Sequence, residues 1–269
     1  METPPVVLSV AGFDPSSGAG ITADVKTIAA HGCYATTCIT ALTVQTTRGV
    51  SQVFAVPAVL VTDTLRELAS DLPPAAVRIG MLASAAVAGA VADFLEQSGA
   101  RNVVLDPVLR SSSGTHLLNP DGVEILRQRL LPRADVLTPN LSEAAALTAM
   151  EVSTPADMRA AAARLHQMGA RTVVLKGGHL EGDETLDLLS VCHAVSPYQE
   201  EFRGSKLKSK ATHGTGCAFA TALACNLALG LLLPEAVAAS KRFVSTAIER
   251  AYPLGHGTGP LNHLFRLEP

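Results

Sequence analysis

The sequence contains no tryptophan, and aromatic residues make up only 4% of its 269 positions. Hydrophobic residues nevertheless reach 48%, so the core must be built mainly from Ala, Val, Leu and Ile. Positive charge is not in excess either, because the net charge is −3. This balance gives no electrostatic reason to expect nucleic acid or an anionic membrane surface as a partner.

The five cysteines show no CxxC spacing and no pairing with histidine at zinc-finger intervals. This pattern predicts a reduced, cytoplasmic protein. No basic segment typical of a signal peptide stands at the N-terminus. The most apolar late stretch, residues 227–233, is interrupted by Gly230 and followed by Pro234, so it is too short to span a bilayer.

Short β-branched runs alternate with longer alanine-rich helical patterns along the chain. Strands that are apolar on both faces and separated by helices predict an α/β fold with a parallel sheet covered on both sides. With no linker or repeat, we expect a single domain over residues 1–269. The expected strands span 6–10, 35–43, 77–81, 103–109, 136–138 and 172–176, with a hairpin at 185–202. The expected helices span 21–30, 62–70, 85–97, 121–130, 142–149, 156–168, 216–229 and 235–251.

Polar or glycine-rich segments punctuate the expected strands near their carboxyl ends, where ligands bind in such folds. Each could be ordinary loop chemistry, but six on one edge of a sheet favour an active site. These segments lie at residues 12–20, 45–47, 80–82, 106–107, 140–143 and 177–179.

The junction at residues 212–217 places two glycines and a threonine directly before an alanine-rich helix. The backbone N–H groups and the dipole at such a helix N-terminus suit a phosphate. Cys217 lies in the first turn, where the same field would lower the pKa of its thiol. Alternatively, Gly214 and Gly216 only shape a tight loop and Cys217 is a small buried filler.

Asp106 interrupts an apolar run, and a buried carboxylate is costly unless it is paired or bound to a metal. Magnesium held by carboxylates and nucleotide phosphates would explain it, as would a structural hydrogen bond. Glu143 could be the second carboxylate, or a charge favoured by the helix dipole. Lys176 ends a strand before two glycines, as the phosphates of a nucleotide would require. Together these features describe magnesium-assisted phosphoryl transfer from ATP.

Two further polar residues are candidates for the acceptor side of the site. Gln45 offers a donor and an acceptor together, which suits the edge of a nitrogen heterocycle. Asp24 follows Gly18-Ala19-Gly20 on the next helix, and spacing alone leaves open whether it is a ligand or a surface carboxylate.

Taken together, these segments resemble the hydroxymethylpyrimidine/phosphomethylpyrimidine kinases of thiamine biosynthesis, in the ribokinase-like superfamily. The resemblance implies a three-layer αβα fold with a mostly parallel central sheet, and a homodimer. It runs in register from about residue 8 to residue 263. The segments that carry it are 11–15, 18–20, 23–27, 39–45, 79–82, 105–108, 138–144, 176–179, 212–217 and 255–260.

The resemblance also implies a role for each matching position. The family's pyrimidine site maps to Gly12, Asp24, Gln45, Met81 and Val108. Its nucleotide and metal side maps to Asp106, Asn140, Glu143 and Lys176, with magnesium at Asp106 and Glu143. Its anion hole maps to Gly214, Thr215 and Gly216, with Cys217 as either a base or only a contact to the hydroxymethyl group.

The segment Leu109-Arg110-Ser111-Ser112-Ser113-Gly114 departs from the Met-Val-Ala-Lys-Ser-Gly usual in bifunctional members. Three hydroxyls and the Arg110 guanidinium would suit a phosphate already on the acceptor. Otherwise this is a polar lid whose arginine meets solvent or ATP. Residues 208–211 also lack the asparagine usual before the anion hole.

These departures favour a kinase that uses ATP and Mg²⁺ to convert the pyrimidine monophosphate to the diphosphate, with activity on the free alcohol left open. A pyridoxal kinase is the nearest alternative, and it is weakened because residues 109–114 contain no cysteine. A catalytically silent vitamin-binding module is an alternative of another class. A sugar kinase is disfavoured because Cys217 replaces the usual aspartate.

Overall fold

The computed structural model describes residues 3–111, 114–193, 196–207 and 209–267. Its strands form one sheet in the order β3-β2-β1-β4-β5-β6-β7-β8-β9. Neighbours from β2 to β7 pair in parallel, whereas β3 at one edge and β8 and β9 at the other pair antiparallel. The strands are β1 (Val6–Phe13), β2 (Tyr34–Thr46), β3 (Gly49–Ala55), β4 (Ala76–Ile79), β5 (Val103–Leu105), β6 (Val136–Leu137), β7 (Thr172–Lys176), β8 (Glu184–Val191) and β9 (Tyr198–Ser205).

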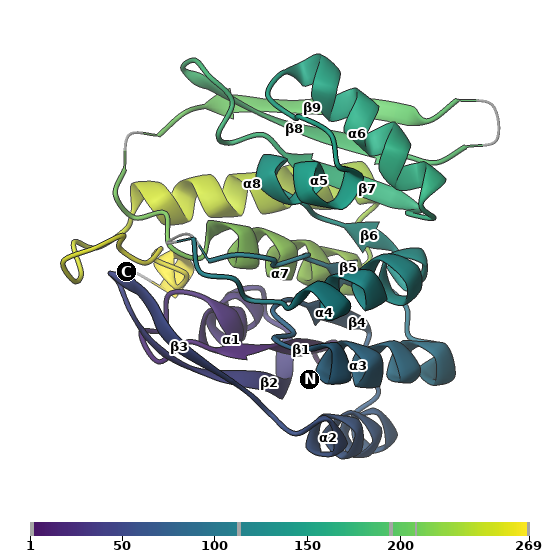
Figure 1. The fold of residues 1–269 in the computed structure, drawn as a ribbon. Coiled ribbons are helices and arrows are strands. Elements are labelled where there is room, and N and C mark those ends of the chain that lie inside the picture. Colours follow the sequence, from purple (N-terminus) through teal and green to yellow (C-terminus); the bar gives the residue numbers. More distant parts are fainter. Residues whose placement is uncertain (1–2, 112–113, 194–195, 208, 268–269) are drawn as a thin grey trace.

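Helices cover both faces of this sheet, with α2 to α6 on one side and α1, α7 and α8 on the other (Figure 1). A buried apolar cluster fills each interface: Leu65, Val91 and Leu165 belong to one, and Ile28 and Leu223 to the other. The expected three-layer αβα fold with a mostly parallel sheet is confirmed. The helices are α1 (Gly20–Ala30), α2 (Ala58–Asp71), α3 (Ala85–Ser98), α4 (Pro120–Ile125), α5 (Leu141–Thr148), α6 (Pro155–Gln167), α7 (Thr215–Ala228) and α8 (Leu233–Glu249).

Several boundaries differ from the expected ones. The strand expected at 103–109 ends at Leu105, before Pro107, which has no N–H to donate to a sheet. The sequence did not predict β3, which pairs with the second half of β2. This pairing extends β2 to Thr46, so Gln45 lies within the strand and not after it. The helix expected at 121–130 changes to a π-helical turn at Leu126–Leu130.

Helix ends near the sheet edge are capped differently. Asn140 and Glu143 form a reciprocal capping box at the start of α5, so two of its first backbone N–H groups are satisfied. The N-cap of α7 is Gly214, and no side chain caps this helix. The N–H of Thr215 donates to the Thr212 carbonyl at 3.4 Å, so the rest of the first turn of α7 offers its N–H groups to another acceptor.

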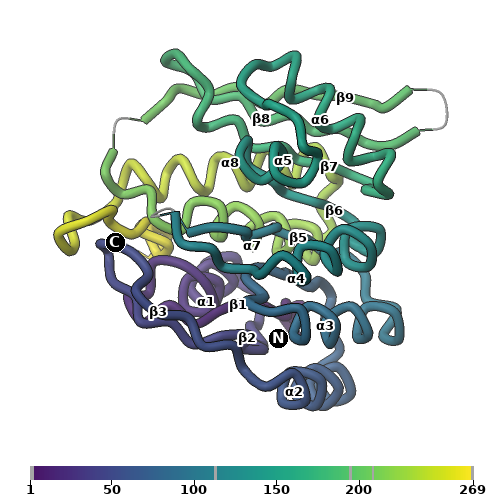
Figure 2. The backbone as a smooth tube through the Cα atoms, in the orientation of Figure 1, coloured from purple at the N-terminus to yellow at the C-terminus, as the bar shows by residue number. Residues whose placement is uncertain are grey.

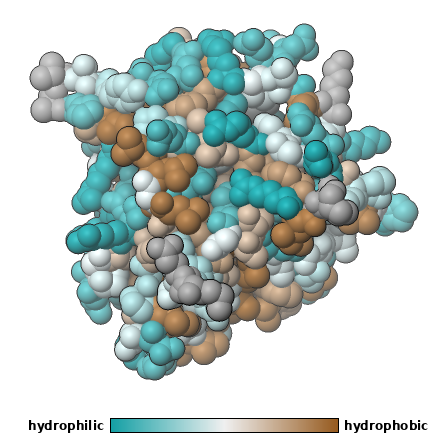
Figure 3. Space-filling view, turned by 180° about the vertical axis from the view of Figure 1, so that it is seen from behind, coloured by the Kyte–Doolittle hydropathy of each residue, from teal (hydrophilic) through white to brown (hydrophobic). Residues whose placement is uncertain are grey.

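The surface of the protein carries both apolar and hydrophilic side chains. On the face seen from behind, apolar side chains are interrupted by hydrophilic ones (Figure 3). Within the described residues, no helix has both the length and the apolar character needed to cross a membrane. All five cysteines are free thiols.

Candidate active site

A cavity of about 1050 Å³ opens where the parallel strands end. The strand-end segments expected to meet at one edge of the sheet do meet around it. Every residue proposed for the site from the sequence lines this cavity except Asp24. The lining residues from that set are Gly12, Gln45, Met81, Asp106, Val108, Arg110, Asn140, Glu143, Lys176, Gly214, Thr215, Gly216 and Cys217.

The N-terminus of α7 is built around a residue that must be glycine. Gly214 has a φ of 82°, and a Cβ there would lie 1.9 Å from the carbonyl oxygen of Gly18. Lys176 approaches the same turn: its Nζ lies 3.1 Å from the position that a Cβ on Gly216 would occupy. An uncapped helix N-terminus and an ammonium group therefore stand side by side, an arrangement that binds and neutralises phosphate oxygens.

Cys217 lies in the first turn of α7, as expected, but its thiol is not activated. Burial raises its pKa, and the nearby carboxylates of Asp106 and Asp24 raise it further. The Arg78 guanidinium and the backbone N–H of Gly20 act in the opposite direction and do not outweigh burial. The prediction that the helix N-terminus lowers this pKa is wrong, because desolvation of the thiolate outweighs the local field.

Asp106 follows β5 and is fully paired. Its Oδ1 accepts hydrogen bonds from Lys176 Nζ at 2.8 Å and from Thr138 Oγ1 at 3.3 Å, and its Oδ2 accepts one from Arg78 at 3.1 Å. The pKa of Asp106 is lowered because the two cations outweigh burial. The pKa of Lys176 is raised by Asp106 and Glu143, so its ammonium stays charged against the cavity.

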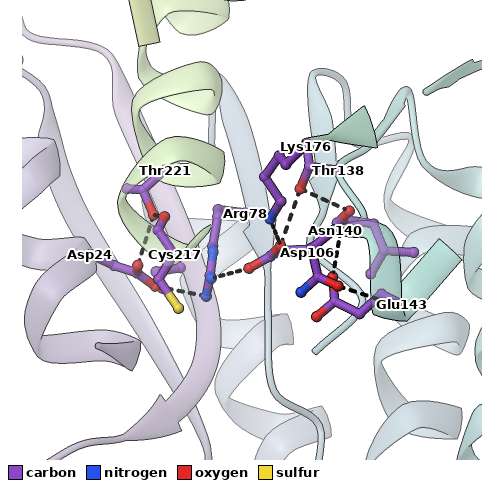
Figure 4. A network of polar contacts seen from close by, with 11 residues as sticks. Asp24, Arg78, Asp106, Thr138, Asn140, Glu143, Lys176, Cys217 and Thr221 are labelled. Carbon is purple, nitrogen blue, oxygen red and sulfur yellow. Dashed lines mark hydrogen bonds and ion pairs between the residues drawn. The ribbon is translucent and has the colours of Figure 1, made fainter. Parts of the chain in front are cut away.

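Arg78, which the sequence patterns did not predict as part of the site, is completely buried in β4. Its guanidinium donates to Asp24 at 3.0 Å and to Asp106, joining α1 to β5 in one line of alternating charges (Figure 4). The sequence does contain a signal for Arg78, because it is a single charged residue inside the apolar strand 76–79. The same kind of signal identified Asp106. Gly80 makes room for it, because a Cβ there would lie 2.1 Å from Arg78 Nη1.

Asp24 lies beneath the cavity and not in its wall. It is fully buried and accepts hydrogen bonds from Ser9 at 2.5 Å and Thr221 at 2.7 Å as well as from Arg78. Burial raises its pKa, and the charge of Arg78 opposes that rise. The expected direct contact between Asp24 and a pyrimidine is therefore not what this geometry offers. Asp24 instead anchors the guanidinium that holds Asp106.

Glu143 caps α5 and also faces the cavity. Its Oε2 accepts from the backbone N–H of Asn140 at 2.8 Å. Burial raises its pKa to about 7, and the charge of Asp106 adds to the rise. The described residues contain no cluster of three or more His, Cys, Asp or Glu side chains that could hold a metal ion. A cation bound here would have only Asp106 and Glu143 as acidic ligands.

The residues that the sequence assigned to the acceptor also line the cavity. A Cβ on Gly12 would lie 2.8 Å from the sulfur of Met81, so glycine lets this thioether form part of the wall. Gln45 Nε2 lies 3.2 Å from His213 Nε2, which is itself 2.8 Å from Asp14 Oδ2. These contacts hold the Gln45 amide in place at the cavity wall.

Arg110 belongs to a small hairpin that contributes to the cavity wall. Leu117 donates its N–H to the carbonyl of Leu109 at 2.9 Å, and Arg110 and His116 form an antiparallel bridge. The Arg110 side chain is exposed and lines the cavity. Of the hydroxyls expected to accompany it, those of residues 112 and 113 lie outside the described residues, as does residue 208 of the segment before the anion hole.

An uncapped helix N-terminus, a half-buried lysine and two carboxylates near the strand ends of an αβα sheet define a phosphotransferase with the ribokinase-like fold. The family model described as phosphomethylpyrimidine kinase matches residues 14–262. The chain belongs to this family.

Named relatives agree with this assignment. A hydroxymethylpyrimidine/phosphomethylpyrimidine kinase of Streptomyces coelicolor is 44% identical over 97% of this chain and 95% of its own length. The thiamine biosynthesis bifunctional protein ThiED of Geobacter sulfurreducens is 45% identical over 97% of this chain, which spans only 53% of that longer protein. Among solved structures, an ADP complex of Bacillus subtilis pyridoxal kinase superposes with a TM-score of 0.89 at 32% identity, covering 99% of this chain and 100% of that one.

Proposed function

We propose that this protein transfers the terminal phosphoryl group of ATP to 4-amino-5-hydroxymethyl-2-methylpyrimidine phosphate, giving the diphosphate used to make thiamine. The observation that carries the choice of acceptor is the position of Arg110. This residue lines the cavity that Gln45 and Met81 also line, and its side chain forms no ion pair with any described residue. A guanidinium free to bind two oxygens suits a phosphate that the acceptor already carries.

The state of Cys217 supports the same acceptor. Because burial raises the pKa of this thiol, it remains protonated at neutral pH and is a poor general base. A phosphate monoester has a second pKa of about 6, so its oxygen is already ionised at pH 7 and needs no base. The free alcohol would have to lose its proton during the reaction. We therefore propose that its phosphorylation is the slower of the two steps.

Other described residues would stabilise charge on the phosphoryl group, position Lys176 and bind magnesium. Lys176 and the first turn of α7 stabilise the negative charge on the transferred phosphoryl group. Asp106 holds Lys176 in place. The carboxylate oxygens of Asp106 and Glu143 fit a magnesium ion that keeps several of its own waters, since hard cations take oxygen ligands. Magnesium bound there would neutralise charge on the nucleotide phosphates.

The test is ATP turnover on three acceptors side by side: the pyrimidine alcohol, its monophosphate and pyridoxal. We expect the monophosphate to have the highest kcat/KM. In the Arg110→Ala variant, its KM should rise about tenfold or more while the KM for ATP stays unchanged, because one charge-assisted contact is lost.

Arg66→Ala is the matched control, since Arg66 is an exposed arginine on α2 that pairs with Asp63. An unchanged monophosphate KM in Arg110→Ala, or a larger rise for ATP, would refute the role of Arg110. Pyridoxal as the best acceptor would refute the proposed substrate.

We also propose a homodimer in the cytoplasm. Leu42, Val44 and Phe54 expose about half of their side chains, at 49%, 50% and 57%. Leu42 and Phe54 are paired across β2 and β3, and Val44 follows two residues later on the same face. A second copy that covers this apolar face would bury it. Light scattering should give twice the 27.8 kDa chain mass, and a monomer mass would refute the dimer.

A further inference from the structure

The glycine-rich loop after α8, residues 255–260, has no part in the chemistry proposed above. It hydrogen bonds to two separate parts of the cavity. The N–H groups of Gly257 and Thr258 donate to Thr47 Oγ1 at 3.2 Å and to the Thr47 carbonyl at 2.9 Å. On its other side, His213 donates its N–H to the Gly259 carbonyl at 3.1 Å. This bridging loop therefore joins the β2–β3 turn to the anion-hole segment (Figure 2).

The glycines of the bridging loop are required by how closely it packs. Gly255 has a φ of 75°, and a Cβ there would lie 2.3 Å from Thr47 Oγ1. A Cβ on Gly257 would lie 2.0 Å from the Thr47 carbonyl oxygen and 2.8 Å from the Cα of Arg48. Any larger residue would push the turn away. The loop thus fixes the backbone from which the Arg48 side chain extends.

Arg48 lies in the turn between β2 and β3. Its side chain is exposed and lines the same cavity as Arg110, and it forms no ion pair or side-chain hydrogen bond with any described residue. The two arginines come from segments that touch, because Thr115 Oγ1 donates to the carbonyl of Val50 at 3.3 Å. The hairpin that carries Arg110 is thus tied to β3, two residues beyond Arg48.

We propose that Arg48 is a second binding residue for the phosphate of the acceptor, and that the bridging loop positions it. Two exposed guanidiniums on neighbouring segments repel each other, and an anion bound by both would relieve that repulsion. A phosphate monoester offers enough oxygens for both to bind. The inference rests on the proposed function, since it requires an acceptor that already carries a phosphate.

The first experiment measures KM for the monophosphate, the alcohol and ATP in Arg48→Ala, Arg48→Lys and the control Arg66→Ala. Arg48→Ala should raise the monophosphate KM about tenfold or more and leave the other two unchanged. Arg48→Lys should recover part of the loss, because lysine restores the charge without the planar fork. An Arg48→Ala enzyme with unchanged monophosphate KM, or with equal rises for both acceptors, overturns the inference.

A double-mutant cycle tests the positioning role of the loop. Gly257→Ala should raise the monophosphate KM, and adding it to Arg48→Ala should cause little further rise, because both act on the same guanidinium. Independent, additive effects would overturn the positioning role.

The failure of each proposal is distinguishable. A wild-type enzyme with no turnover of either pyrimidine refutes the proposed function, whereas a monophosphate kinase insensitive to Arg48→Ala refutes only this inference.

Discussion

Replacing Arg78 with methionine removes the central cation of the buried network while keeping a side chain of similar length. Asp106 still has Lys176 and Thr138 as partners. Asp24 keeps the hydrogen bonds from two hydroxyls, which lower its pKa, but it loses the charge of Arg78, the strongest opponent of the burial that raises its pKa. We therefore expect Asp24 to take up a proton in the folded Arg78→Met variant at neutral pH.

The free energy needed to protonate Asp24 gives the expected decrease in the free energy of unfolding. An unfolded aspartate has a pKa of about 3.9, and one pKa unit corresponds to about 1.36 kcal/mol. Keeping Asp24 neutral in the folded state therefore costs about 4 kcal/mol at pH 7 and about 1.5 kcal/mol at pH 5. The loss should shrink as pH falls, because the unfolded chain then also binds the proton more readily.

Urea unfolding followed by circular dichroism at pH 7 and pH 5 measures both values. The double variant Asp24→Asn/Arg78→Met is the matched control, since an amide needs no proton. Its oxygen accepts a hydrogen bond from one of the two hydroxyls, Ser9 or Thr221, and its NH2 group donates to the other. The double variant should recover most of the stability at pH 7 and lose the added pH dependence. Equal destabilisation of Arg78→Met at both pH values, or no recovery in the double variant, would refute the reasoning.

Three further outcomes follow from the site and its surroundings. Lys176→Met should lower kcat by about 100-fold or more with little change in the acceptor KM, because the cation acts on the transferred phosphoryl group; a mainly KM effect would contradict this. Removing divalent cations with EDTA should abolish turnover, and added magnesium should restore it; full activity in EDTA would exclude the proposed use of Asp106 and Glu143. His31 and His263 are buried, with pKa values lowered from 6.5 to about 4, so the stability that their neutral forms contribute is present above pH 6.5 and lost as pH falls towards 4. Unfolding free energy should drop by about 2 kcal/mol per histidine between pH 7.5 and 5, and His31→Gln should remove about half of that drop.

The sequence predicted the sheet well where periodicity carries the signal. Most of the parallel strands are short apolar runs buried on both faces, and such runs are visible without knowledge of their neighbours. β3 was missed because residues 49–55 are largely exposed and form a strand only by pairing with β2. Edge strands of this kind depend on tertiary context more than on composition.

In the candidate site, the sequence predicted which residues lie at or near the strand ends. It did not predict how the pKa values of those residues are shifted. Asp106 and Lys176 were both identified as members of the site, because a charge at the end of a buried strand is conspicuous. The raised pKa of Cys217 depends on burial and on two carboxylates distant in sequence, Asp24 and Asp106. The partner of Asp24 on β4, Arg78, lies 54 residues away. A local sequence pattern cannot show that residues so far apart in the chain contact each other.

Hydrogen bonds tie α1 and the loop before it to α7 and the segment before it, and this has a consequence for synthesis of the chain on the ribosome. Asp14 meets His213 and Asp24 meets Thr221 across separations of 199 and 197 residues. A chain is made from its N-terminus, so β1 and α1 emerge long before these partners exist. A nascent chain ending before α7 has the buried charges of Asp24 and Arg78 but no helix to cover them. Nucleotide binding should therefore appear late, only after α7 has left the ribosome.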